Sequence, residues 1–501
     1  MPNPYLLAID QGTTSTRAVV YDGAGRVCGS AGRELTQHYA QPGWVEHDPE
    51  EIWQSVLDVI PRALASAKVE AGALAAVGVT NQRETVVLWE RDTGRPLARA
   101  IVWQDRRTAD FCRERRQDED WLRQRTGLVL DPYFSATKLH WLLQQDATWR
   151  ARAAAGKLAC GTIDSFLIWR LTGGRVHATD RTNASRTLLF NLNAGCWDDE
   201  LCKYFDVAAA LLPEVRASAA DYGTVAGLGV LPDGLPIRGV AGDQQAALFG
   251  QGAFAPGEAK CTYGTGAFFL QHLGDKATLS KHRLLTTLAA SGEGPAQYAL
   301  EGSVFVAGAA VQWLRDGLRL LDSAPAIEEL AARSDPEQPV LFVPGFVGLG
   351  APHWIPEARG VLFGITRGTT AADLGRATLE GVAFQVADLI EAASADAGVR
   401  LSSLRVDGGM ARNARFLQIQ ADLLGMPILQ TAQSEATALG AAMLAGLRAG
   451  VWPDETSLRR LTAEAKRFEP SLPETERRRR HEQWQRAVRA VVAFYTSQPG
   501  R

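Results

Sequence analysis

Two short turns rich in glycine and hydroxyl side chains lie in opposite halves of this 501-residue chain, and each stands between β-like runs. The second turn carries Thr265 between two glycines. Glycine allows the backbone to turn tightly, and successive amides and hydroxyls at such a turn form a concave site for anionic oxygens. Two copies predict a duplicated architecture that holds a polyphosphate from both sides. In the first turn, the side chains that could meet phosphate are Thr13, Thr14, Ser15 and Arg17.

Asp10 and Asp243 each end a short apolar run at a turn, a common place for functional carboxylates in α/β proteins. In an enzyme that uses a nucleotide, one carboxylate can hold Mg²⁺ while another accepts the proton of an attacking hydroxyl. Asp243 also precedes a helical pattern, so its side chain could cap that helix instead. The two roles can coexist.

Arg83 and Glu84 place a planar donor fork beside an acceptor at the end of another apolar run. A neutral polyol has hydroxyls that need both donors and acceptors, so this pair suits such a ligand. The alternative is an exposed ion pair, which is common and contributes little. Trp103 and Tyr133 could form aromatic walls for the same ligand, or could fill the core.

A second set of residues could hold a nucleotide. Gly409 follows an apolar run and opens a helical pattern, where a flat base or ribose could lie against the backbone, and Asn413 could then bond an adenine edge. The alternative is a tight turn with a helix cap. Gly308 and Gln312 lie four residues apart on one expected helix face.

The elements that must position these residues mix strands and helices in both halves, which indicates an α/β class with two domains. We expect a domain over residues 1–251 and another over residues 252–501. A basic helix, residues 474–495, closes the chain, either as a solvated face or as a partner surface. Further expected helices cover residues 48–67, 136–155, 372–395 and 413–424, and expected strands cover 74–80, 86–89, 259–272 and 285–301.

The composition excludes several protein classes. A net charge of −3 gives no sign of a nucleic-acid surface. Six cysteines without a CxxC pair, and an N-terminus without a basic signal region, predict a cytoplasmic protein with free thiols. No apolar run approaches the ~18 residues of a membrane span. The sequence also lacks a Walker A motif and a GxGxxG fingerprint, so any nucleotide is bound in another way.

Taken together, these motifs resemble the FGGY carbohydrate kinases, from residue 8 to about residue 450. The resemblance implies two domains of the ribonuclease-H-like, actin and sugar-kinase type, with the active site in the cleft between them. The most specific matching segments are residues 8–15, 42–49, 80–85, 131–135, 182–187, 241–250 and 263–266.

The resemblance also implies transfer of phosphate from Mg-ATP to glycerol, giving glycerol 3-phosphate. Asp243 would be the general base, and Asp10 with Asp243 would lie near Mg²⁺. The polyol would contact Arg83, Glu84, Tyr133, Asp243 and Gln244, with Trp103 and Phe268 as apolar walls. The terminal phosphates would meet Thr13, Thr14, Ser15 and Arg17, and the rest of the nucleotide would meet Thr265, Gly308, Gln312, Gly409 and Asn413.

Two other functions remain open from the sequence. The first is a kinase for another small polyol or a ketose, and the second is a non-catalytic nucleotide-dependent scaffold on the actin-like fold. The resemblance further implies a homo-oligomer, either a dimer or a tetramer. One departure from the family pattern is Ile355, which stands where the family often has an aspartate after its Gly-Ala-Pro-aromatic-Trp motif.

Overall fold

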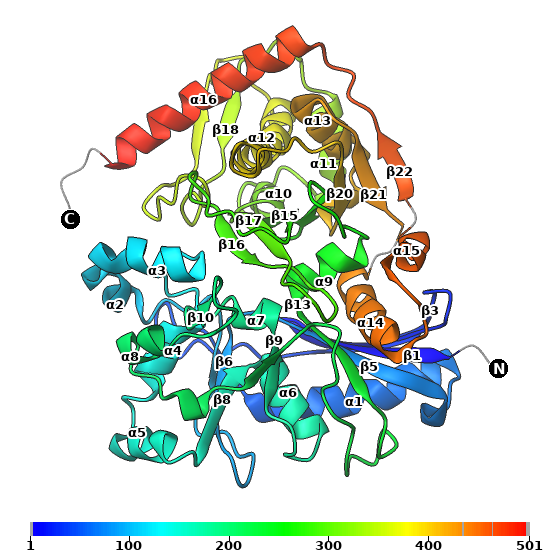
Figure 1. Ribbon diagram of the computed structural model, residues 1–501. Helices are drawn as coiled ribbons and strands as arrows, with labels where there is room; N and C mark the ends of the chain where they lie inside the picture. The colour runs from blue at the N-terminus through cyan, green and yellow to red at the C-terminus, as the bar shows by residue number, and fades with distance from the viewer. Residues whose placement is uncertain (1–3, 433–434, 463, 497–501) are drawn as a thin grey trace.

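The computed structural model describes residues 4–432, 435–462 and 464–496. Residues 1–3, in which the sequence predicts no signal region, lie outside this part. The structure has two large mixed sheets, one in each half of the chain (Figure 1). The expected α/β class is confirmed.

The two sheets share one order of strands. In the first sheet β1 pairs antiparallel with β2, and β2 with β3, while β5 and β13 run parallel to β1 on its other side. In the second sheet β14, β15, β17, β20 and β21 repeat this pattern, and β16 and β22 extend its edges. The duplication predicted from the two turns is therefore present in the topology. The strands of the first sheet are Tyr5–Gln11 (β1), Ser15–Tyr21 (β2), Val27–Glu34 (β3), Leu74–Asn81 (β5) and Ile237–Gly242 (β13). Those of the second are Ala259–Tyr263 (β14), Ala267–Gly274 (β15), Leu285–Leu288 (β16), Tyr298–Val304 (β17), Leu404–Asp407 (β20), Ile428–Thr431 (β21) and Glu464–Phe468 (β22).

The first sheet is a layer between helices, because successive side chains of a strand point to opposite faces. Leu7 and Ile9 of β1 pack with α1 (Pro49–Ala67) and α6 (Ile163–Leu171) on one face. Leu6 and Ala8 pack on the other face with α14 (Ala436–Ala449), although α14 comes from the second half of the chain. Figure 1 shows α14, in orange, beside β1 and β5.

Helix α9 (Asp243–Gly250) follows β13 and contacts strands of both sheets. It packs closely against α14, since a Cβ at Gly440 would lie only 1.9 Å from the carbonyl oxygen of Ala246. Only glycine permits this approach of two backbones. The first residue of α9, Asp243, is thereby held where the two sheets meet.

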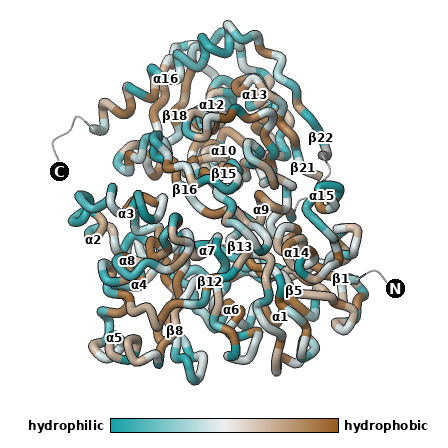
Figure 2. Tube along the Cα trace, viewed as in Figure 1, coloured by the Kyte–Doolittle hydropathy of each residue, from teal (hydrophilic) through white to brown (hydrophobic). Residues whose placement is uncertain are grey.

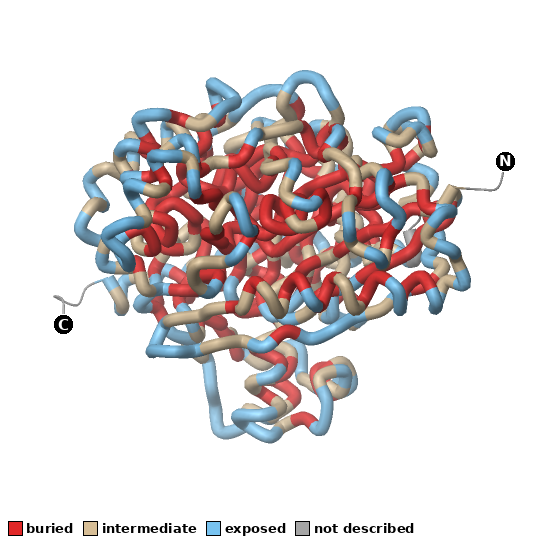
Figure 3. The backbone as a smooth tube through the Cα atoms, turned by 90° about the horizontal axis from the view of Figure 1, so that it is seen from below, coloured by how far each residue is buried: buried red, intermediate tan, exposed pale blue. Residues whose placement is uncertain are grey.

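A third sheet joins β4 (Glu46–His47), β7 (Ala100–Ile101), β6 (Val86–Glu90) and β8 (Leu158–Thr162). Buried residues form the centre of the molecule, and hydrophobic residues gather along its inner strands and helices (Figures 2 and 3). The remaining strands are Ala178–Asp180 (β9), Phe190–Asn191 (β10), Cys196–Trp197 (β11), Glu214–Arg216 (β12), Leu341–Val343 (β18) and Val361–Phe363 (β19). The remaining α-helices are Ala109–Glu114 (α2), Glu119–Thr126 (α3), Ser135–Leu142 (α4), Ala147–Ala154 (α5), Arg181–Ala184 (α7), Asp199–Tyr204 (α8), Gly308–Asp316 (α10), Ile327–Ala332 (α11), Ala371–Ala397 (α12), Ala414–Leu424 (α13), Glu455–Leu458 (α15) and Glu474–Thr496 (α16).

One expected helix is wrong in extent. Residues 136–155 form two helices, α4 and α5, because the chain leaves α4 after Leu142 and Asp146 starts a new helix. The Asp146 side chain accepts a hydrogen bond from the backbone amide of Thr148 at 2.7 Å, as a helix N-cap does. The other expected helices, including α1 with its Asp48 cap, are confirmed.

The basic run of α16 forms ion pairs along its own helix. Arg478 pairs with Glu474, and Arg479 and Arg480 both pair with Glu476. Arg480 also lies 3.5 Å from Glu380 of α12, and Trp484, one turn after Arg480, packs into the hydrophobic core of the second half of the chain. A cavity of about 570 Å³ lies between α16 and α12, and none of the predicted site residues lines it. The helix thus has a solvated face, as one of the two interpretations predicts.

The six cysteines are free thiols, as predicted. Within the described residues, none of the helices is long and apolar enough to cross a membrane.

Candidate active site

Asp243 is the first residue of α9, and Gly242 occupies the N-cap position. Its Oδ1 accepts a hydrogen bond from the backbone amide of the next residue, Gln244, at 2.7 Å. The interpretation of Asp243 as the N-cap residue is therefore wrong by one position. Its side chain remains 30 % exposed, and Oδ1 lies 3.2 Å from Nε of Arg83. Burial raises the pKa of Asp243, while Arg83 and Lys260 act in the opposite direction.

Arg83 and Glu84 follow β5 and are almost completely buried, so the interpretation as an exposed ion pair is wrong. Nη2 of Arg83 donates to the Tyr133 hydroxyl at 3.4 Å. Burial raises the pKa of Glu84, and Arg83 and Arg186 oppose that shift. Arg83 therefore lies beside both the candidate base and the Tyr133 hydroxyl, so that hydrogen-bond donors and acceptors adjoin each other here.

An aromatic pair covers one side of this group. The rings of Trp103 and Tyr133 meet edge to face with centroids 5.6 Å apart. The indole N–H of Trp103 donates to the hydroxyl of Thr13 at 2.9 Å. This hydrogen bond joins the candidate polyol wall to the first candidate phosphate turn. The sequence alone does not reveal this link.

Gln244 and Phe268 lie at the edge of the group. The Gln244 side-chain oxygen accepts a hydrogen bond from Nζ of Lys260, which is buried on β14 and also donates to Thr262 at 2.9 Å. Burial lowers the pKa of Lys260, against the field of Asp407. Phe268 is partly exposed on β15, and among the described residues it has no ring contact with the Trp103–Tyr133 pair.

The first turn connects β1 to β2 and is closed by a hydrogen bond from Gly12 to the carbonyl of Ser15 at 2.9 Å. The turn leaves Thr13, Thr14 and Ser15 partly or fully exposed. Arg17 forms a 2.8 Å ion pair with Glu435, which precedes α14. The pKa of Asp10 is raised to about 7, chiefly by burial and also by the charges of Asp243 and Glu435, while Arg17 opposes the shift.

The second turn connects β14 to β15 and packs on the start of α10. The amide of Gly308 donates to the carbonyl of Gly264 at 3.0 Å, and the amide of Ala307 donates to that of Thr265 at 2.8 Å. A Cβ at Gly308 would lie 2.6 Å from the Gly264 oxygen, so glycine is required by close approach. Thr265 and Gln312 are exposed on this surface.

Gly409 and Asn413 follow β20 at the corresponding edge of the second sheet. Gly409 is exposed, and a Cβ added there would meet nothing within 4 Å. Asn413 caps α13, since its side-chain oxygen accepts from the amide of Phe416 at 2.8 Å. The capping interpretation is therefore confirmed, and the Asn413 NH₂ group is the part that could reach a base.

Two buried residues of the site are missing from the prediction, Glu301 on β17 and Arg186 after α7. Glu301 accepts hydrogen bonds from both Nη groups of Arg83, at 2.5 and 2.9 Å. Arg186 donates to Glu84 at 2.7 Å and to Glu301 at 3.1 Å. Arg186 falls in a segment that resembles the family, which is a usable signal, but Glu301 carries no local signal.

The predicted metal ligands Asp10 and Asp243 interact electrostatically, because the charge of Asp243 raises the pKa of Asp10.

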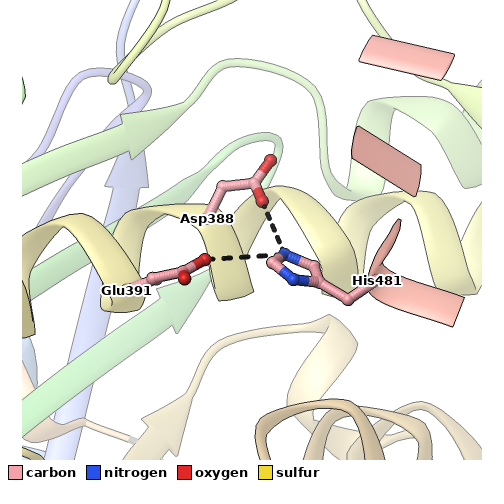
Figure 4. Close-up of side chains that lie close together, drawn as sticks. All are labelled: Asp388, Glu391 and His481. Carbon is pink, nitrogen blue, oxygen red and sulfur yellow. Dashed lines mark hydrogen bonds and ion pairs between the residues drawn. The ribbon is translucent and has the colours of Figure 1, made fainter. Parts of the chain in front are cut away.

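A separate cluster of three possible metal-binding side chains lies in the described part of the chain. It consists of Asp388 and Glu391 on α12 and His481 on α16 (Figure 4). Both oxygens of Asp388 already accept hydrogen bonds from Trp484 and Gln485. That cluster is accordingly an interhelical polar contact.

The departure at Ile355 has a structural role. Its side chain packs in the second core, and its backbone exchanges two 3.0 Å hydrogen bonds with Leu349. A carboxylate would be poorly accommodated in these apolar surroundings.

Comparisons with known proteins agree with this geometry. Models of the FGGY family of carbohydrate kinases match residues 5–250 with the N-terminal domain and 259–449 with the C-terminal domain. A glycerol kinase of Alkalilimnicola ehrlichii is 55 % identical over 488 residues, 97 % of each chain. A glycerol kinase of Koribacter versatilis is 52 % identical over 494 residues, 98 % of this chain and 99 % of the relative.

A crystal structure of Plasmodium falciparum glycerol kinase with ADP superposes with a TM-score of 0.93 at 36 % identity, covering 98 % of both chains. A ligand-bound xylulose kinase from Lactobacillus acidophilus reaches a TM-score of 0.89 at 22 % identity, which shows the shared fold alone. With both domains matched in order and the site built from both halves, this chain belongs to the FGGY family of carbohydrate kinases.

Proposed function

We propose that this protein is an ATP-dependent glycerol kinase that forms sn-glycerol 3-phosphate. The observation that carries the proposal is the position of Arg83, whose guanidinium group contacts the partly exposed carboxylate of Asp243 and the hydroxyl of Tyr133. Relatives over 50 % identical along nearly the whole chain bear the name glycerol kinase. The aromatic pair beside Arg83 suits the carbon backbone of a small polyol.

In this proposal Asp243 accepts the proton of a primary hydroxyl as that oxygen attacks the terminal phosphoryl group of ATP in line. Its raised pKa suits this role, because a stronger base takes the proton more readily. The other residues act by orientation. Arg83, Glu84, Tyr133 and Gln244 would fix the glycerol hydroxyls, with Trp103 and Phe268 as apolar walls. Phosphoryl transfer depends mainly on such positioning and on neutralisation of charge.

The nucleotide would lie across the two turns. Thr13, Thr14, Ser15 and Arg17 would meet the terminal phosphates, and Thr265, Gly308, Gln312, Gly409 and Asn413 would hold the remainder. Arg17 would then exchange its Glu435 partner for phosphate oxygens. Exclusion of water from the closed site would prevent loss of ATP to hydrolysis.

Asp10 and Asp243 fit a Mg²⁺ site. The charge of Asp243 raises the pKa of Asp10, and the buried hydroxyl of Thr80, paired with Asp10 in the sheet register, has no hydrogen-bond partner. A divalent cation relieves repulsion between neighbouring carboxylates and is held with few protein ligands. When bound, Mg²⁺ would neutralise charge on the phosphate oxygens.

The test is ADP release with Mg-ATP, comparing glycerol with xylulose, ribulose, erythritol and no acceptor. Wild-type protein should turn over glycerol, and Asp243→Asn should lose ~10²–10⁴-fold or more in kcat. The amide can still accept the Gln244 hydrogen bond, so α9 should begin as before. Asp146→Asn is the control, because Asp146 also accepts a backbone hydrogen bond at the start of a helix, from the amide of Thr148, and is exposed.

Turnover with another acceptor and not with glycerol would change the substrate assigned in this proposal and leave the proposed mechanism unchanged. A folded, ATP-binding protein without acceptor-dependent turnover would overturn the kinase proposal in favour of a scaffold. The homo-oligomeric state and the cytoplasmic location stay predictions.

A further inference from the structure

The candidate polyol site is completed by a buried side chain from the other half of the chain. Arg83, Glu84 and Arg186 all belong to the first half, whereas Glu301 comes from β17 in the second sheet. Glu301 binds both Nη groups of Arg83 and one of Arg186, and its side chain is fully buried. We infer that Glu301 is a positioning residue that fixes the guanidinium group of Arg83 for the polyol.

The Nη groups of Arg83 are all engaged by protein side chains. Both bind Glu301, Nη1 also reaches the side-chain oxygen of Gln245 at 3.1 Å, and Nη2 reaches the Tyr133 hydroxyl at 3.4 Å. The Nε edge is the one that faces Asp243, at 3.2 Å. A two-point grip of this kind sets the orientation of a guanidinium plane far more strictly than one hydrogen bond.

The two buried arginines, Arg83 and Arg186, also require the negative charge of Glu301. Burial disfavours its ionised form, yet Arg186 and Arg83 lower the pKa of Glu301 to about 2, so it is ionised at neutral pH. Without this charge, two buried guanidinium groups would share Glu84 and the Asp243 carboxylate. Arg83 would then turn toward Asp243 and Glu84, the two acceptors that glycerol needs.

The arrangement also links the polyol site to the relation between the two sheets. Glu301 sits in register with Leu270 of β15, the strand that leaves the second phosphate turn. Arg83 follows β5 of the first sheet. The hydrogen bonds between Arg83 and Glu301 therefore form only where the two halves of the chain meet. Polyol binding then depends on the second half, even though the other polar groups that would contact the polyol come from the first half and α9.

The test rests on the proposed function and uses Glu301→Gln, which keeps the shape and removes the charge. We expect the KM and the dissociation constant for glycerol to rise about 10- to 100-fold, because a buried charged hydrogen-bond partner is lost. The dissociation constant for ADP should change less than about twofold, which also shows that the protein is folded.

Glu380→Gln is the matched control. Glu380 is a buried glutamate of the second half that pairs with Arg376 at 3.0 Å, on α12 and away from Arg83. Its substitution should lower the melting temperature and leave the KM for glycerol unchanged. If Glu301→Gln does not fold, Glu301→Asp keeps the charge but is too short to grip both arginines, and the same loss of glycerol affinity is expected.

Two results would overturn the inference. One is a glycerol affinity for the Glu301 variant no lower than that of Glu380→Gln, and the other is an equal loss of glycerol and ADP affinity. Wild-type protein that does not act on glycerol at all would instead overturn the proposed function, and with it the substrate assigned here.

Discussion

Replacement of Gly409 by alanine separates a nucleotide-binding role from a structural one. A Cβ at this position meets no protein atom within 4 Å, and the backbone has φ −62° and ψ −45°, which alanine adopts freely. The substitution should therefore stabilise the protein by ~0.4–1 kcal/mol, since it restricts the unfolded chain. If the base or ribose lies against this glycine, the added methyl group should raise the KM for ATP about tenfold or more.

Gly308→Ala should behave differently. Its Cβ would lie 2.6 Å from a backbone oxygen of the second phosphate turn, which cannot move without displacing that turn. Such overpacking costs ~1–3 kcal/mol, so both stability and ATP affinity should fall. Gly72→Ala is the control, because Gly72 is exposed, has open space for a Cβ and lies away from the turns.

The assays are urea unfolding of each variant and the KM for ATP at saturating glycerol, with ADP binding measured by titration calorimetry. A Gly409 variant that gains stability and binds ATP and ADP as the wild type does would refute the placement of the nucleotide. If Gly409→Ala instead lowers the free energy of unfolding, the conclusion that a Cβ has open space at this position is wrong.

Two further substitutions test other parts of the site. The pKa of Asp10 rises from 3.8 to about 7 on folding, which costs at most about 4 kcal/mol above pH 7 and disappears as the pH falls toward 4. Asp10→Asn should therefore raise the free energy of unfolding without metal more at pH 8 than at pH 5.5, and an equal gain at both would exclude charge as the cause. Trp103→Phe keeps the aromatic wall but removes the hydrogen bond to Thr13, so kcat should fall by up to about tenfold, as expected for ~0.5–1.5 kcal/mol. A change in glycerol KM alone would show that the indole N–H serves the polyol and not the phosphate turn.

The local parts of the fold were predictable because they depend on residues close in sequence. The hairpin around residues 12–14 follows from a glycine and hydroxyl turn between two β-like runs, and α1 follows from the helical pattern of residues 48–67. The break between α4 and α5 was missed, because apolar spacing continued through a segment that Asp146 restarts as a new helix.

The chain by itself therefore determined the class of fold, its duplication and the side chains available for catalysis. Only the tertiary structure decided their environment. Arg83 and Glu84 have the sequence of an ordinary surface ion pair, and they are buried because Glu301, 218 residues from Arg83, supplies the charge that makes burial possible. A charge can leave water only where partners replace its solvation, and folding brings those partners from distant parts of the chain.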